Sequence, residues 1–260
     1  MRLRQSVVIP IFTQERAGLE KFFEQLHGIG FEAVEFWERG MFDDFPGVLK
    51  LARTHGLVVA NMIGHASLKD GLNKAENHDR IERELRQSID LASDHGITGL
   101  ICFSGDRTPG QSDLDGLLVS ARALKRIAPY AERKGVNLNV ELLNSRIDHL
   151  GYQCDRTEWG AVLCEMVGSP RVKLLYDIYH MQIMEGDVIR TIRGNAARIG
   201  HYHLAGVPGR RDPDDQQELN YRAICRAIAD TGYDGYVGHE YVPRADAVAS
   251  LRASFALCDV

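Results

Sequence analysis

Four residues with oxygen or nitrogen donors stand at matched positions in the second half of the chain: Glu141, Asp177, His203 and Glu240. Each ends a short, mostly apolar run, and they lie 36, 26 and 37 residues apart, about one strand–helix unit each. If the runs are parallel strands, the four side chains converge. Three carboxylates can converge only if a cation offsets their repulsion. This donor set predicts one divalent metal ion, Mn²⁺ or Mg²⁺ with Co²⁺ as a substitute.

Four further side chains lie close enough to the predicted strand ends to contact a substrate: His180, Arg210, His65 and Trp37. Arg210 belongs to the long polar segment VPGRRDPDDQQELNY, which has the length of a lid or binding loop. Its guanidinium is suited to bidentate pairing with a carboxylate, and Arg146 is a second candidate for that role. Trp37 and Phe103 are candidates for an apolar wall. The alternative for each is a structural or surface role.

The remaining histidines differ in what they predict. His201 shares a strand face with His203, whereas His239 should point away from Glu240 into the helix layer. His149 and the other histidines are expected to be structural or to lie on the surface.

The elements that must position these side chains are eight short strands, several of them almost uniformly apolar, as is typical of parallel strands covered on both faces. The candidates are Val7–Ile11, Ala33–Phe36, Leu57–Asn61, Gly99–Phe103, Asn137–Glu141, Val172–Asp177, Ile199–His203 and Tyr236–Glu240. Amphipathic stretches such as Arg80–His95 lie between them, and glycine precedes the next strand in HGITG and KGVNL. The pattern predicts an α/β fold: a single-domain (β/α)8 TIM barrel over residues 1–260. A doubly wound sheet is the alternative, but IPIFTQERAG lacks its glycine-rich phosphate turn.

The composition excludes several partners. The formal net charge of −5 argues against a nucleic-acid partner, and no apolar run is long enough to predict a membrane span. The five cysteines include no CxxC pair, so neither a disulfide framework nor a zinc ribbon is indicated. A cytoplasmic location is therefore expected.

Five segments carry a family resemblance: GFEAVEFW, VELLN, YDIYHMQIMEGD, HYHLAGVPGRRDP and GYVGHEY. On these segments the chain resembles the hydroxypyruvate isomerase family of the xylose-isomerase-like TIM-barrel superfamily, which includes the D-tagatose and D-psicose 3-epimerases. The resemblance implies that Glu141 and Glu240 are proton donor and acceptor as well as metal ligands. It also implies that Asp177 and His203 complete the metal shell and that the histidine at position 180 contacts substrate. Related enzymes are dimers or tetramers, so a homodimer or homotetramer is expected.

The implied function is a metal-dependent sugar-type isomerase that transfers a proton through a cis-enediolate, with hydroxypyruvate and tartronate semialdehyde as the first expectation. Hydroxypyruvate isomerases tend to carry Gln where His203 stands and Asp where Gly206 stands, whereas the 3-epimerases carry His at the former position. A 3-epimerase acting on a ketose or keto-sugar is therefore the main alternative to an isomerase acting on a small hydroxy-keto acid. An inosose-type dehydratase, an endonuclease IV-like nuclease and a non-catalytic sugar-binding barrel are less favoured. The sequence does not assign acid and base between Glu141 and Glu240.

Overall fold

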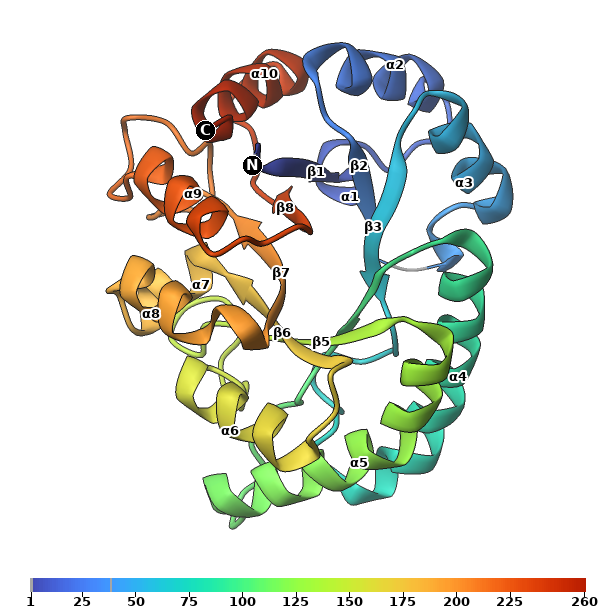
Figure 1. Cartoon of the computed structure of the whole chain (residues 1–260), viewed down its shortest axis with the longest axis vertical. Helices are drawn as coiled ribbons and strands as arrows, with labels where there is room; N and C mark the ends of the chain where they lie inside the picture. Colours follow the sequence, from blue (N-terminus) through green and yellow to red (C-terminus); the bar gives the residue numbers. More distant parts are fainter. Residues whose placement is uncertain (1, 38) are drawn as a thin grey trace.

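Eight parallel strands close into one barrel in the computed structural model, which describes residues 2–37 and 39–260 (Figure 1). Each strand pairs with its neighbours in chain order, and the last closes onto the first. The strands are Arg4–Val8 (β1), Ala33–Phe36 (β2), Val58–Ile63 (β3), Gly99–Cys102 (β4), Asn137–Glu141 (β5), Val172–Asp177 (β6), Ile199–Leu204 (β7) and Tyr236–His239 (β8). The predicted (β/α)8 fold is confirmed.

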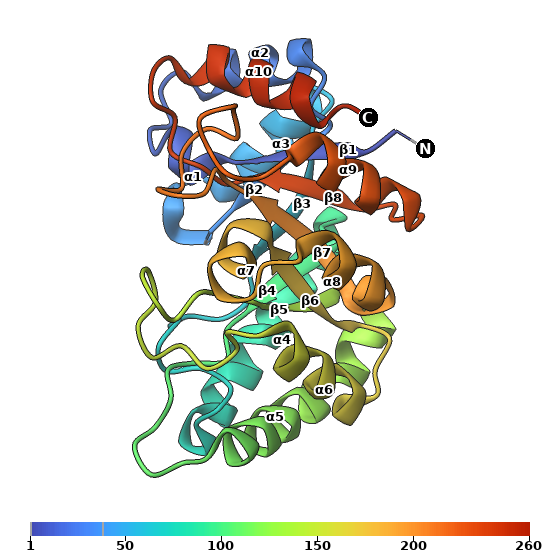
Figure 2. The same cartoon turned by 90° about the vertical axis from the view of Figure 1, so that its left-hand side faces the viewer.

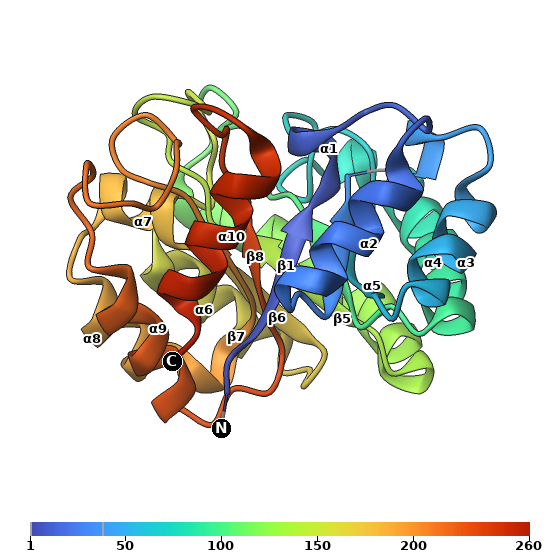
Figure 3. The same cartoon turned by 90° about the horizontal axis from the view of Figure 1, so that it is seen from above.

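An outer layer of helices surrounds the barrel (Figure 1), and Figure 2 shows the same layer from the side. The helices are Ile9–Phe12 (α1), Leu19–Ile29 (α2), Phe45–Thr54 (α3), His78–His95 (α4), Asp113–Lys134 (α5), Thr157–Val167 (α6), Ile178–Met184 (α7), Val188–Asn195 (α8), Tyr221–Asp230 (α9) and Ala247–Cys258 (α10). Within the described residues, no helix is long and apolar enough to cross a membrane. Both chain termini lie at the end of the barrel where the strands begin (Figure 3), so the opposite, carboxyl-terminal mouth is left to the βα loops.

The first strand was predicted three residues too late. The apolar run Val7–Ile11 suggested a strand, but β1 is Arg4–Val8 and the chain turns into α1 at Ile9. Pro10 explains the difference, because it has no N–H for a strand ladder and is favoured in the first turn of a helix. The predictions of β2, β5 and β6 are confirmed to the residue.

The interior of the barrel is unusually polar for this fold, whose interiors are normally filled by branched aliphatic side chains. Glu35 of β2 contacts His201 and His203 of β7, a strand that does not adjoin β2, so these side chains cross the interior. Asn139 of β5 lies beside Gly200 of β7 in the same way. On the outer face, His239 contacts Gln5 and Ser254 of α10, in the orientation expected from strand alternation.

A glycine in β8, Gly238, leaves the room in which the side chains of Glu35 and His203 meet across the interior. A Cβ atom on Gly238 would lie 2.4 Å from Glu35 Oε1 and 2.7 Å from the Cδ2 atom of His203. Any larger residue would therefore push apart the carboxylate and the imidazole that meet inside the barrel.

Replacement of Gly238 by alanine is expected to lower the free energy of unfolding by about 1–3 kcal/mol, because the added methyl overpacks a buried site. Denaturant unfolding measures this. The control is Gly28→Ala in α2, where nothing lies within 4 Å of the added Cβ and stability should stay the same or rise. Equal stability of Gly238→Ala and the wild type would contradict the packing argument.

Candidate active site

The barrel brings together the four donors predicted from the spacing. Glu141 and Asp177 are the last residues of β5 and β6, His203 lies in β7 opposite Asp177, and Glu240 directly follows β8. One donor atom from each lies within 4.8 Å of the others, and all four residues are buried. Strand register, rather than any flexible loop, sets this convergence.

His203 is held from behind by a carboxylate. Its Nε2 lies 3.0 Å from Glu35 Oε2, and because a carboxylate only accepts, Nε2 carries the proton. The other nitrogen, Nδ1, is buried without a hydrogen-bond partner and lies 3.3 Å from Glu240 Oε2 and 3.7 Å from Glu141 Oε1. Burial alone would lower the pKa of His203, but Glu240 and Glu35 raise it well above its usual range, so Nδ1 holds a proton between two carboxylates, where a metal ion could take its place. The carboxylate behind the ring is the usual partner of a metal-binding histidine.

The two glutamates experience different electrostatic environments. Arg210 Nη2 donates to Glu240 Oε2 at 2.6 Å. Burial alone would raise the pKa of Glu240, but the charges of Arg210 and His203 outweigh it and hold the pKa well below its usual range. Burial raises the pKa of Glu141, and the nearby charge of Glu240 adds to the rise. Burial, reinforced by Glu240, also raises the pKa of Asp177 to about 7. The cluster therefore holds more carboxylate charge than its own cations compensate.

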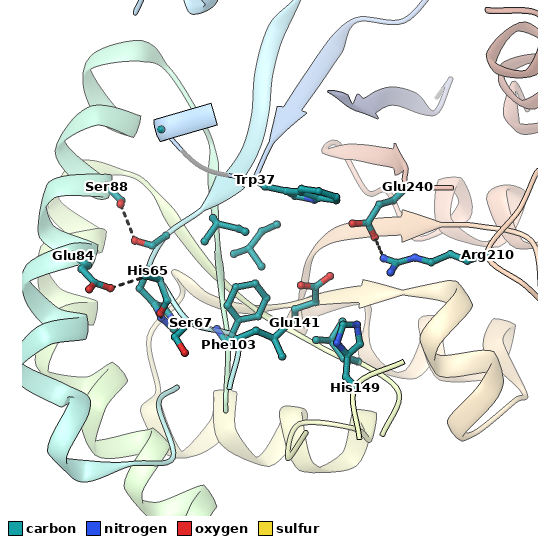
Figure 4. A pocket seen from close by; sticks show the side chains of 17 residues that line it. Trp37, His65, Ser67, Glu84, Ser88, Phe103, Glu141, His149, Arg210 and Glu240 are labelled. Atoms are coloured by element: carbon teal, nitrogen blue, oxygen red, sulfur yellow. Dashed lines mark hydrogen bonds and ion pairs between the residues drawn. The ribbon is translucent and has the colours of Figure 1, made fainter. Parts of the chain in front are cut away.

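A cavity of about 780 Å³ opens beside this cluster (Figure 4). Glu141 and Glu240 line it, whereas Asp177 and His203 are each only 1% exposed and are absent from its wall. The four donors thus divide into two that face the cavity and two that lie behind them.

Three of the four side chains expected to contact substrate line this cavity: Trp37, His65 and Arg210. Trp37 is 37% exposed at its mouth, and Phe103 forms part of the apolar wall as expected. His180 does not line it. Its Nδ1 accepts from the backbone N–H of Asn144, and its Nε2 lies 3.6 Å from Asp177 Oδ2 without a hydrogen-bond partner.

The polar atoms of His65 are already used. Its Nε2 accepts the backbone N–H of Phe103 at 3.0 Å, and its Nδ1 lies 3.1 Å from the carbonyl oxygen of Ala66. The ring is therefore neutral and connects the loops after β3 and β4, and it presents carbon atoms to the cavity.

Sequence reasoning missed two contributors and placed a third wrongly. Glu35 was missed although it is the one charged residue in an otherwise apolar strand, a signal that could have found it. His149 was expected to be structural or on the surface, but it lines the cavity from the loop after β5. Arg146, the second candidate for an anion contact, instead donates to the carbonyl oxygen of Ile183 and is absent from the cavity wall.

Comparison with known proteins gives the family. The family model described as xylose isomerase-like TIM barrel matches residues 23–257. The chain belongs to the xylose isomerase-like TIM barrel family. It is 30% identical to the putative hydroxypyruvate isomerase of Homo sapiens over 96% of this chain and 93% of that protein. It is 39% identical to the 2-oxo-tetronate isomerase of Cupriavidus necator, but over only 60% of this chain and 57% of that relative, a little over half its length.

Two solved structures superpose over all or nearly all of the chain. The AP endonuclease, family 2, from Brucella melitensis gives a TM-score of 0.82 at 27% identity, covering 100% of both chains. The D-psicose 3-epimerase of Clostridium cellulolyticum H10 gives 0.82 at 17% identity over 98% of each chain, a likeness of fold alone. The curated relatives described above are named isomerases, and the expectation that this xylose isomerase-like barrel is an enzyme of the isomerase class is confirmed.

The neutral state of His65 generates a pH prediction. Burial lowers its pKa from an ordinary value of 6.5 to about 4. Between these values the unfolded chain binds more protons than the folded chain, so this contribution to stability is complete above pH 6.5 and is lost as the pH falls toward 4. Over that window the unfolding free energy of the wild type should fall more steeply than that of His65→Gln, by up to about 1.4 kcal/mol per pH unit.

Denaturant unfolding at a series of pH values tests this difference. His27→Gln, a change at an exposed position of α2, is the control and should keep the wild-type slope. Parallel slopes for the wild type and His65→Gln would contradict the assignment.

Proposed function

We propose that this protein is a metal-dependent isomerase that shifts a proton between the adjacent carbonyl and hydroxyl carbons of a small 2-oxo acid, of the hydroxypyruvate and 2-oxo-tetronate class. The observation that carries the proposal is the division of the cluster: Glu141 and Glu240 line the cavity, while Asp177 and His203 are buried behind them. The names of the curated relatives support the substrate class.

Glu141, Asp177, His203 and Glu240 would hold the metal ion, with Mn²⁺ or Mg²⁺ suited to three carboxylates and one imidazole. When bound, such an ion supplies Lewis-acid polarisation of a carbonyl oxygen. The unpartnered Nδ1 of His203 supports this fit. Glu35 has the separate task of fixing the imidazole by accepting its Nε2 proton.

The proton is carried by the two glutamates that reach the cavity. One carboxylate removes it from carbon and the other returns it, to the neighbouring carbon of the enediolate in an isomerase. Arg210 keeps Glu240 ionised, whereas Glu141 is the more basic of the two because burial disfavours its charge.

Arg210 also provides a place for the substrate carboxylate. Its Nη2 is bound to Glu240, but its Nε is buried without a hydrogen-bond partner. Arg210 lines the cavity beside the paired glutamates, and a guanidinium in that place is suited to a 2-oxo acid, because it pairs with carboxylates.

A 3-epimerase acting on a ketose is the second candidate. The histidine at position 203 favours it, since it matches the residue that the epimerases of the resembled superfamily carry. The same glutamates would then act on opposite faces of one carbon. We expect metal analysis to exclude the nuclease alternative, because an endonuclease IV-type site needs three zinc ions per chain.

Glu141→Gln and Glu240→Gln are each expected to lower kcat by about 10²–10⁴-fold, because each removes a group that transfers the proton. The measurement incubates the Mn²⁺-loaded enzyme in D₂O with hydroxypyruvate and, separately, with ketopentoses and ketohexoses, and follows deuterium at carbon. Deuterium on the neighbouring carbon identifies an isomerase, and deuterium on the original carbon of a ketose identifies an epimerase.

The matched control is Glu76→Gln, since Glu76 is exposed and lies outside the cavity. Turnover near the wild-type level in either glutamate variant of the cluster would refute the scheme, and so would a content of three zinc ions per chain.

Glu35→Gln is expected to weaken Mn²⁺ binding by about 10–100-fold. Both carboxylate oxygens of Glu35 accept hydrogen bonds: Oε2 accepts from His203, and Oε1 accepts from His201 and Ser6. A glutamine has only one acceptor oxygen and cannot make both sets of contacts. Titration calorimetry measures the affinity. Ser6→Ala, which keeps the contact between Glu35 and His203, should cause a smaller loss. Wild-type affinity in Glu35→Gln would contradict this positioning role.

Two wider expectations belong to the same proposal. We propose a cytoplasmic location, which five free, buried cysteines support. We also propose a homodimer or homotetramer, on the family resemblance, which sedimentation measures.

A further inference from the structure

The cavity extends well beyond the paired glutamates. From Glu141 and Glu240 it runs beneath Trp37 to the loop after β3 and to helix α4, where Ser67 and Glu84 line its far end (Figure 4). The site proposed for proton transfer occupies one end only, so the remaining length needs its own explanation.

The volume is the first argument. At about 30 Å³ for each molecule of liquid water, a cavity of about 780 Å³ corresponds to roughly 26 waters. A three-carbon acid held at Glu141 and Glu240 would leave most of this space to solvent. Pockets of this size ordinarily enclose larger ligands and bury most of their surface.

The middle of the cavity is apolar on both sides. Trp37 forms one wall, and Ile63, Phe103 and Leu143 are among the residues that line it with Trp37. An indole at the mouth of a cavity is suited to the C–H face of a sugar chain or ring, because it offers a large, rigid apolar surface. This section therefore fits a carbon skeleton more than a second charged group.

The far end is polar without net charge. Glu84 Oε2 accepts the backbone N–H of Ala66 at 2.9 Å, and both carboxylate oxygens of Glu84 accept from Arg80. The ion pair neutralises the carboxylate but leaves lone pairs for a further donor. Among the described residues that line the cavity, Arg210 is the only arginine or lysine. A phosphate or second carboxylate would meet no free cation at Glu84, whereas hydroxyl groups would find acceptors there.

We infer that the substrate is a polyhydroxylated 2-oxo acid of five or six carbons. Its carboxylate lies at Arg210, its skeleton passes beneath Trp37, and its terminal hydroxyl groups donate to Glu84. This inference rests on the proposed function for the reacting end, and it adds a subsite, formed by Ser67, Glu84 and the Trp37 wall, that selects for chain length.

The test compares hydroxypyruvate, 2-oxo-tetronate, a 2-oxo-hexonate and D-psicose as substrates of the Mn²⁺-loaded enzyme in D₂O. We expect kcat/KM for the six-carbon acid to exceed that for hydroxypyruvate at least tenfold, mainly through KM. Thermal protection by each compound gives a second readout that needs no turnover.

Two variants probe the subsite by different means. Glu84→Gln removes acceptor capacity and the pairing with Arg80, and Ala66→Leu fills space at the far end, where Ala66 lines the wall. Each is expected to lower the ratio of kcat/KM between the six-carbon and three-carbon acids at least fivefold. Glu76→Gln, outside the cavity, should keep the wild-type ratio.

The outcomes separate the two proposals. Exchange that is as efficient with hydroxypyruvate as with the longer acids, exchange with D-psicose alone, or an unchanged ratio in both variants would overturn the subsite. In the first of these cases the proposed isomerase would stand. Exchange with none of the compounds would refute the proposed function and the subsite that rests on it.

Discussion

The packing of four buried carboxylates around one imidazole is the constraint on which the rest of the site depends. Glu35, Glu141, Asp177 and Glu240 all lie within contact distance of His203 or of one another. Burying carboxylates together costs several kcal/mol for each charge that is not compensated. A single arginine contacts the cluster, at Glu240, and His203 can offset at most one charge. This charge balance supports the proposed divalent cation, to which Nδ1 of His203 would supply a nitrogen ligand.

The contact between Glu35 and His203 affects how the interior of the barrel is packed. A barrel interior is normally a packed aliphatic core, but here the interior must hold Glu35 against His203. Gly238 leaves the space that the pair occupies, so the barrel gives up apolar contacts at this level. The outer layer of helices and the buried apolar residues between helices and strands supply stability instead. Much of the hydrophobic core thus lies between the strands and the helices, where it does not compete with the buried charges for space.

The sequence predicted what is local and missed what depends on distant contacts. Glu141 and Asp177 were found because each ends an apolar run, and β5 and β6 were bounded correctly for the same reason. Glu35 stands out locally as the one charged residue of its strand, but its partners His201 and His203 lie 166 and 168 residues away, so the sequence does not show what it pairs with. Proline at position 10 did carry a local signal, but the apolar run around it was given more weight. The length of the cavity depends on residues from the segments after β2 and β3 and from α4, whose meeting no spacing encodes.

The donors of the cluster and the other residues that line the cavity come from different parts of the barrel. All four donors of the cluster come from β5 to β8 and the positions that directly follow them, so their spacing is fixed by strand register. The Trp37 wall and the polar far end come instead from the segments after β2 and β3 and from α4. Loops tolerate substitution far better than paired strands do. One half of the barrel can therefore keep the geometry of the cluster while substitutions in the other half change the length and polarity of the cavity. Under the proposed function, the residues that set the length of the substrate lie on the side of β2 to α4.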